Sequence, residues 1–290
     1  MLSQTLFKKL SLLVDKGPKK ELRQEILSYY NNIAKAEIAP EVQEALEFLK
    51  KNRLHVFPYS FTHNYSANDI KVYEDKHLGL RYVMHHGRKL YFKRTWSKRK
   101  IRRNYNFLLL EQDTQSPHCY LTPEYNVEQG DIVVDAGAAE GNFALTVIEQ
   151  AEKVYLFETD NEWIEALEAT FAPWKEKVEI VNKFVSNVNN DHYISLDSYF
   201  QDKGKVDFIK ADVEGAEAEL LDGSTNLIAH NPKIKIAVAT YHKQKDQQEL
   251  SEALQKYGFN TRFSNGYMLF PHMEALKPPY FRRGLIRAWK

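Results

Sequence analysis

DIVVDAGAAEGNFALTVIEQAEKVYLFETD, residues 131–160, is the stretch that decides the fold of this 290-residue chain. Its first residues are apolar and predict a strand, and Gly137 and Gly141 frame the turn that follows. From Glu140 onward the apolar residues recur at helical spacing, which predicts a helix. Residues 154–157 predict a second strand. The stretch therefore predicts a strand, turn, helix and strand whose turn lies next to a ligand.

The charges around this turn indicate which ligand it binds. Glu158 ends the second strand, at about the separation from Gly137 at which an acid accepts the ribose hydroxyls of a nucleoside. Ala139 departs from the GxGxxG pattern of dinucleotide-binding turns. Asp135 and Glu140 flank the turn, where carboxylates repel phosphate and attract a cation. This favours S-adenosylmethionine, a sulfonium compound, over NAD, and a general nucleotide-binding domain remains the alternative.

The composition indicates a globular protein and limits its chemistry. Hydrophobic residues make up 43% of the chain, so disorder is not indicated. The single cysteine, Cys119, excludes an internal disulfide and a thiolate zinc cage, and it favours a reducing compartment. Lys8 and Lys9 interrupt the apolar pattern that a secretory signal would need, and no apolar run has membrane-spanning length. We therefore expect a cytoplasmic protein without a transmembrane segment.

Charge divides the chain into two parts. Residues 1–104 contain 22 Lys and Arg against 10 Asp and Glu, whereas residues 105–290 contain 18 against 29. We predict two modules: an N-terminal module, residues 1–104, with a role in substrate or partner binding, and residues 105–290, which contain the cofactor-binding stretch. The N-terminal module is expected to contain helices within residues 1–52 and a small β-meander over residues 70–94. His85 and the residue after it are expected at the surface, beside a tight turn.

The N-terminal module ends in a strongly basic stretch. RKLYFKRTWSKRKIRR, residues 88–103, contains nine basic residues in sixteen, with three aromatic residues among them. Such a stretch binds the phosphates of RNA, lipid head groups or an anionic glycan. A solvated helix face, or a docking surface for the acidic domain, explains it equally well.

The C-terminal domain repeats the unit of the central stretch. Further strands are predicted at residues 178–185, 206–211, 234–240, 260–264 and 267–270. The last two are predicted to pair as a hairpin. Five parallel strands closed by an antiparallel hairpin form the Rossmann-like sheet of a class I methyltransferase, within the α/β class.

Several segments, in this order, resemble a known family. DIVVDAGAAEGNFAL, FETD, the LD of ISLDSYF, FIKADVEGAEAELLDGS and IAVATYHKQKD together are similar to FkbM-family methyltransferases, which use S-adenosylmethionine. The similarity covers roughly residues 105–270. It implies O-methylation, often of sugar hydroxyls in glycans, glycolipids or natural products.

The resemblance also implies the residues that bind the cofactor. Those around its methionine end would be Asp135, Gly137, Ala138, Glu140, Gly141 and Asn142. Glu158 would accept the ribose hydroxyls, and Thr159 and Asp160 would lie near the adenosine. The family often has proline after the strand-end acid, and Thr159 takes that place here.

The candidate catalytic residues follow the fourth and fifth strands. Ligands of open α/β sheets bind at the carboxyl ends of the strands, where Asp212, Glu214 and His242 are expected. A protonated sugar hydroxyl is a poor nucleophile, and His242 is the preferred general base because imidazole titrates near neutral pH. The two acids would orient it, bind the cofactor's amine or hold Mg²⁺. Two carboxylates are too few to assert a metal, and a structural hydrogen bond of His242 remains the alternative.

Three further positions bear on this site. Lys210 shares a strand face with Asp212, and a lysine inside a central strand needs a partner acid, so we expect a structural ion pair. His118 and Tyr120 lie in a proline-containing loop that is expected to cross the upper edge of the sheet. They are further candidates for the pocket.

Two other functions stay open. An RNA methyltransferase would use residues 88–103 to bind its substrate, although no NPPY-type motif for amine methylation is present. A non-catalytic adaptor would keep the cofactor domain as a scaffold and bind partners through the basic module. The sequence does not identify the acceptor, the oligomeric state or any metal dependence.

Overall fold

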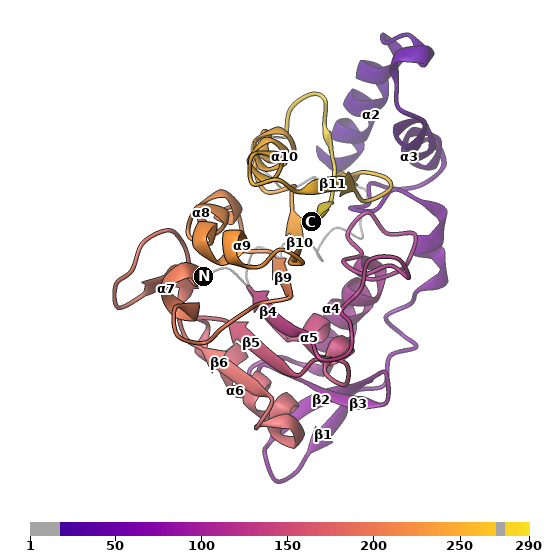
Figure 1. The fold of residues 1–290 in the computed structure, drawn as a ribbon. Helices are drawn as coiled ribbons and strands as arrows, with labels where there is room; N and C mark the ends of the chain where they lie inside the picture. Colours follow the sequence, from indigo (N-terminus) through magenta and orange to yellow (C-terminus); the bar gives the residue numbers. More distant parts are fainter. Residues whose placement is uncertain (1–17, 271–275) are drawn as a thin grey trace.

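The computed structural model describes residues 18–270 and 276–290 (Figure 1). Of the helices expected within residues 1–52, the first falls before residue 18 and lies outside the described residues. Its centre is a seven-stranded sheet in the order β11-β14-β10-β9-β4-β5-β6. The strands are β4 (Ile132–Ala136), β5 (Lys153–Phe157), β6 (Val178–Val181), β9 (Phe208–Ala211), β10 (Lys235–Ala239), β11 (Asn260–Phe263) and β14 (Leu285–Trp289). The five from β10 to β6 are parallel, and β14 and β11 are antiparallel to their neighbours. The predicted α/β fold with a mostly parallel methyltransferase-type sheet is confirmed.

The predicted C-terminal hairpin is wrong in its pairing. Residues 260–263 pair with β14, and residues 268–269 (β12, Met268–Leu269) pair with β13 (Phe281–Arg282) in a separate two-stranded sheet. The strand beside β10 is buried on both of its faces, and this requirement decides which strand pairs there. Four of the five residues of β14 are buried, whereas β11 alternates exposed and half-buried residues. The apolar strand therefore takes the inner position and the polar strand takes the edge.

Helices cover both faces of the sheet. One face carries α7 (Leu196–Phe200), α8 (Glu217–Asp222), α9 (Thr225–His230) and α10 (Asp246–Lys256). The other face carries α4 (Lys98–Glu111), α5 (Asn142–Val147) and α6 (Asn161–Phe171). Side chains alternate between the two cores, so Val133 belongs to one and Val134 to the other. Burial on both faces explains why these strands read as continuous apolar runs.

The N-terminal part contains the predicted helices and meander. Its elements are α2 (Pro18–Asn31), α3 (Pro40–Lys51), β1 (Tyr73–Asp75), β2 (Leu80–His85) and β3 (Arg88–Phe92). The turn between β2 and β3 has positive φ at His86 and Gly87, as a tight hairpin turn requires. His85 was expected at the surface but is buried, because the meander packs on α5 and places His85 Nε2 3.0 Å from Thr146 Oγ1. The buried residues of this part are continuous with the core over the α4 face of the sheet.

Four members of the basic stretch 88–103 form ion pairs within the protein. The pairs are Arg88–Glu149 (3.3 Å), Lys89–Asp75 (3.1 Å), Lys93–Asp160 and Arg94–Glu165 (2.6 Å). Three of the four acids lie in the C-terminal part. Part of the stretch is therefore a docking surface for that acidic part.

Two features concern the membrane and the thiol: the described residues contain no membrane-spanning helix, and Cys119 is buried. Within residues 18–270 and 276–290, no helix combines the length and the apolar character that crossing a bilayer requires. Cys119 is a free thiol and is buried. Burial raises the pKa of this thiol, which lowers its reactivity at neutral pH.

Candidate functional site

The turn between β4 and α5 is where the backbone requires glycine. Gly137 has φ of 75°, and a Cβ there would lie 2.1 Å from the backbone oxygen of Asp212. Gly141 has φ of 79°, and Ala139 takes the left-handed conformation as well. The bare backbone at Gly137 therefore lets the ends of β4 and β9 meet at one edge of the sheet.

A cavity of about 610 Å³ opens at this edge. Of the residues predicted to bind the cofactor, five line it: Gly137, Glu140, Glu158, Thr159 and Asp160. The other four, Asp135, Ala138, Gly141 and Asn142, lie in the same turn but do not line the cavity. Asp212 and Glu214, two of the three predicted catalytic residues, line its far side.

Glu158 connects the second strand to the glycine turn. Its Oε2 accepts a hydrogen bond from the backbone N–H of Ala139 at 2.9 Å. Its Oε1 accepts from the N–H groups of Thr159 at 2.7 Å and Asp160 at 2.8 Å. A carboxylate has about four acceptor positions, so one remains for a ligand hydroxyl. Glu158 both holds the turn and faces the cavity.

Glu140 is a buried acid beside the cavity. Burial raises the pKa of Glu140 to about 7. A backbone hydrogen bond and Lys210 lower this pKa by less, and Asp135 and Glu158 raise it further. Its charge therefore changes near neutral pH. A cationic ligand in the cavity would favour the ionised form.

Asp135 lies behind the cavity. It is completely buried, and its Oδ1 is 2.9 Å from Lys210 Nζ. Lys210 also donates to the backbone oxygen of Gly137 at 2.7 Å. Burial alone would lower the pKa of Lys210, but Asp135 and the other nearby acids raise it above its ordinary value. The predicted partner acid of Lys210 is confirmed, and the negative charge of Asp135 is neutralised before it reaches the cavity.

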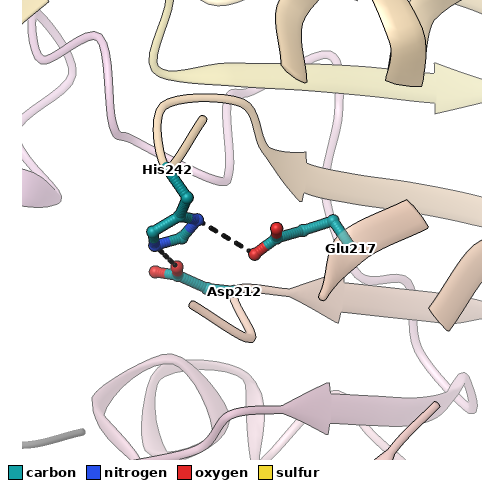
Figure 2. Close-up of side chains that lie close together, drawn as sticks. All are labelled: Asp212, Glu217 and His242. Carbon is teal, nitrogen blue, oxygen red and sulfur yellow. Dashed lines mark ion pairs between the residues drawn. The ribbon is translucent and has the colours of Figure 1, made fainter. Parts of the chain in front are cut away.

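The predicted catalytic residues come together, with one addition. His242 Nε2 lies 3.4 Å from Asp212 Oδ1 and 3.6 Å from Glu214 Oε2. Its Nδ1 lies 3.0 Å from Glu217 Oε1 (Figure 2). Glu217, at the start of α8, was not among the predicted residues. An acid opening the helix after a strand-end acid was the available signal, five residues beyond Asp212.

These acids change how His242 behaves. Burial lowers the pKa of His242, but the carboxylates of Glu217, Asp212 and Glu214 outweigh burial and raise it above its ordinary value. With a raised pKa, the imidazole binds a proton more tightly. His242 can accept a proton from a substrate only in the fraction that is deprotonated, so this environment opposes a simple role as general base.

Asp212 is held by groups from two other segments. The hydroxyls of Tyr120 and Tyr241 donate to it at 2.8 and 3.1 Å, and His118 Nε2 lies 3.5 Å from its Oδ2. Burial would raise the pKa of Asp212, but His118 and His242 help to hold it well below its usual range. Asp212 is therefore ionised. His118 and Tyr120, predicted as possible pocket residues, contact Asp212 but do not themselves line the cavity.

The N-terminal part contributes two lining residues that the sequence did not indicate. Trp96 and Asn104 both face the cavity. Asn104 is completely buried, and neither polar atom of its amide has a hydrogen-bond partner in the protein. A buried amide normally finds a partner, so a ligand in the cavity is expected to supply one. No signal in the sequence distinguishes Asn104 from the basic residues around it.

A family model matches the central part of this chain. The model of the Methyltransferase FkbM domain matches residues 122–273, more than half of the chain. A search among curated proteins found no match.

Among solved structures, the chain is similar to an FkbM methyltransferase from Methylobacillus flagellatus KT, with 16% identity and a TM-score of 0.43. That match covers 64% of this chain and 54% of the other, so the chain spans about half of the length of that protein. A precorrin-6y C5,15-methyltransferase from Geobacter metallireducens GS-15 has 12% identity and a TM-score of 0.40, over 57% of this chain and 84% of that one. An rRNA methylase from Streptococcus thermophilus has 14% identity and a TM-score of 0.36, over 57% and 89%. These are likenesses of fold.

Proposed function

This chain belongs to the FkbM methyltransferase family, and from that premise we propose that it is an O-methyltransferase that uses S-adenosylmethionine. We propose that the acceptor is a sugar hydroxyl of a glycan, glycolipid or glycosylated natural product. The observation that carries the proposal is the cavity at the carboxyl ends of β4, β5 and β9, where acids lie around a turn whose Gly137 has no side chain.

The charges of this cavity fit a cationic methyl donor. Its acidic lining residues are Glu140, Glu158, Asp160, Asp212 and Glu214, and the one lysine of the lining is Lys183. Asp160 is paired with Lys93, which leaves four acids to attract a cation. A sulfonium and an amino group are attracted to such a lining, and the phosphates of a dinucleotide are repelled. Asp135, which was expected to attract the cation, does not contribute to this attraction, because Lys210 neutralises its charge inside the protein.

Residues of this chain would hold the donor at two points. Glu158 has an acceptor position for a ribose hydroxyl, and the backbone of Gly137 leaves room for close approach. Glu140 would face the cationic end. When bound, S-adenosylmethionine supplies a methyl group: its S–CH₃ bond breaks as the O–CH₃ bond forms, and the sulfonium becomes a thioether.

The acceptor hydroxyl must lose its proton as the new bond forms. We assign this hydroxyl to the side of the cavity where Asp212 and Glu214 lie, with His242 behind them. Asp212 and Glu214 orient the hydroxyl, and its proton passes to water or to the fraction of His242 that is deprotonated. Trp96 and Asn104 place the N-terminal module at the same cavity, and we propose that the module takes part in acceptor choice.

RNA is the less favoured acceptor. Residues 88–103 are the segment that would bind RNA, and four of their nine basic residues form ion pairs with acids of this protein. Breaking those pairs would offset part of the attraction to phosphates. The remaining basic residues keep binding of an anionic partner as a proposal.

The test is incorporation of a labelled methyl group. Protein would be incubated with methyl-labelled S-adenosylmethionine and with separated saccharide, lipid, protein and RNA fractions. We expect label in the saccharide or glycolipid fraction, with His242→Ala reducing transfer far more than it reduces cofactor binding. The exposed acid Glu249 on α10 offers the matched control, Glu249→Gln, which should behave as wild type.

Two results would contradict the proposal in different ways. Label confined to RNA would show an RNA methyltransferase. Saturable cofactor binding with no transfer to any fraction would favour an adaptor.

A further inference from the structure

One histidine is surrounded by three carboxylates. His242 lies within 4 Å of the acids of Asp212, Glu214 and Glu217, which approach it from both ring nitrogens. Figure 2 shows two of these acids, Asp212 at one ring nitrogen and Glu217 at the other. The side chain of His242 is 6% exposed and that of Glu217 is 1% exposed. Such a concentration of buried negative charge needs a compensating cation.

Neighbouring groups compensate part of this charge: His118 Nε2 lies 3.5 Å from Asp212 Oδ2, and Glu217 Oε1 accepts two backbone N–H hydrogen bonds. Lys210, the closest buried lysine, is held by Asp135 at 2.9 Å and by a backbone oxygen. One proton on His242 would balance only one of the three acids. Neither ring nitrogen has a hydrogen-bond partner of suitable geometry, although each faces a carboxylate. The ring is therefore aimed at acids with which it does not share a well-formed hydrogen bond.

The distances among the side chains of Asp212, Glu217 and His242 are near those between ligands that share one ion. One ligand atom from each of Asp212, Glu217 and His242 can be chosen so that all three lie within 4.8 Å of one another. An octahedral ion with bonds of about 2.1 Å holds neighbouring ligand atoms about 3 Å apart and opposite ones about 4 Å apart. Asp212 and Glu217 lie nearest to different ring nitrogens of His242, so a shared ion requires one of the two acids to turn toward the nitrogen that binds it.

The surroundings of the cluster resemble the outer shell of a metal site. The hydroxyls of Tyr120 and Tyr241 donate to Asp212 at 2.8 and 3.1 Å and fix its orientation. Groups that hydrogen-bond to a ligand in this way are typical of metal centres. Asp212 and Glu214 also line the cavity, which gives an ion a route of entry.

We propose that Asp212, Glu217 and His242 bind a divalent cation of the Mg²⁺ and Mn²⁺ class, with Glu214 on the side of the cavity. Carboxylate oxygens select hard ions of this class, and two carboxylates here accompany a single imidazole. The role of the ion rests on the proposed function: beside the cavity, it would lower the pKa of an acceptor hydroxyl and stabilise the charge that develops on oxygen. His242 is then an ion ligand, which agrees with an environment unfavourable for a general base.

The experiment is binding of Mn²⁺ to the full chain, after treatment with a chelator and dialysis, without cofactor or acceptor. Calorimetry should give one Mn²⁺ per chain for the wild type. Asp212→Asn and Glu217→Gln should each weaken binding by at least tenfold, because a lost ligand costs no less than a lost outer-shell partner. Glu249→Gln, an exposed acid away from the cluster, should bind as wild type does.

A second measurement needs no variant and covers the case in which a substitution prevents folding. Pulsed electron paramagnetic resonance of the Mn²⁺-loaded wild type should show coupling to one imidazole nitrogen. Absence of that coupling, absence of saturable Mn²⁺ binding, or equal binding by both variants and the control would each overturn the site. Mn²⁺ binding without methyl transfer would leave the site standing and defeat the proposed function, and methyl transfer without Mn²⁺ binding would do the reverse.

Discussion

Replacing Glu158 with glutamine should weaken both the fold and the cofactor site. The carboxylate accepts three backbone hydrogen bonds, from Ala139, Thr159 and Asp160, which tie the end of β5 to the glycine turn. Glutamine has the same shape but only one acceptor oxygen. In its better orientation it keeps the two bonds at the Oε1 position and turns its amide donors toward the N–H of Ala139.

The magnitude follows from the bonds that are lost. A hydrogen bond to a charged group contributes about 1.5–3 kcal/mol, and a donor facing a donor adds to the loss. Since the carboxylate is half-buried, we expect the lower part of this range, about 1.5–2 kcal/mol. For a chain of this size that corresponds to a fall in Tm of about 3–8 °C. Loss of the ribose contact should weaken S-adenosylmethionine binding by about 10- to 100-fold.

Thermal unfolding and calorimetry of Glu158→Gln measure the two effects separately. Glu168→Gln, an exposed acid on the neighbouring α6, is the matched control. A Tm and a cofactor Kd both equal to the control would refute the reasoning. A lower Tm with an unchanged Kd would mean that Glu158 stabilises the glycine turn but does not bind the ribose.

Gly137→Ala should lower stability by at least about 1–2 kcal/mol in urea unfolding, because alanine is strained at positive φ and its Cβ would meet the backbone oxygen of Asp212; unchanged stability would mean that the two strand ends are free to separate. Lys210→Met should cost about 3–5 kcal/mol by leaving Asp135 charged and unpaired, and adding Asp135→Asn should restore part of the loss; a double variant no more stable than the single one would contradict this. The pKa of Glu140, raised by burial to about 7, predicts that binding of the sulfonium S-adenosylmethionine relative to its thioether product strengthens roughly three- to fourfold from pH 6 to pH 8, since about 1 kcal/mol of attraction appears as the carboxyl ionises. Glu140→Gln should make that ratio independent of pH, and a pH dependence that persists in the variant would exclude Glu140 as its source.

The fold was predictable where the pattern along the chain was enough to define each element. The parallel strands are apolar on both faces and alternate with amphipathic helices, so their sequence alone predicts a sheet covered on both sides. The C-terminal pairing was not predictable in this way. Residues 260–263 and 267–270 lie close in sequence, but β14, from the end of the chain, enters beside β10 because its residues are apolar enough for burial on both faces.

The cofactor residues were predictable as a group, but their orientation was not. Gly137, Glu140 and Glu158 lie within one βαβ unit, so local geometry brings them to one cavity. Asp135 comes from the same unit and yet turns to Lys210, one strand away. Whether a carboxylate serves a ligand or the core depends on the neighbouring strand, which the local sequence does not contain.

By itself the sequence determined the α/β fold, the glycine turn, the strand-end acids and the family to which they belong, because each depends on residues close together in the chain. Only the tertiary structure decided that Glu217 faces the far side of His242, that two tyrosines hold Asp212, and that Asn104 reaches the cavity from the N-terminal module. The contact of Tyr120 with Asp212, for example, joins residues 92 positions apart in the chain. Their geometry results from how the layers pack on one sheet, and no local pattern records which side chains will meet there.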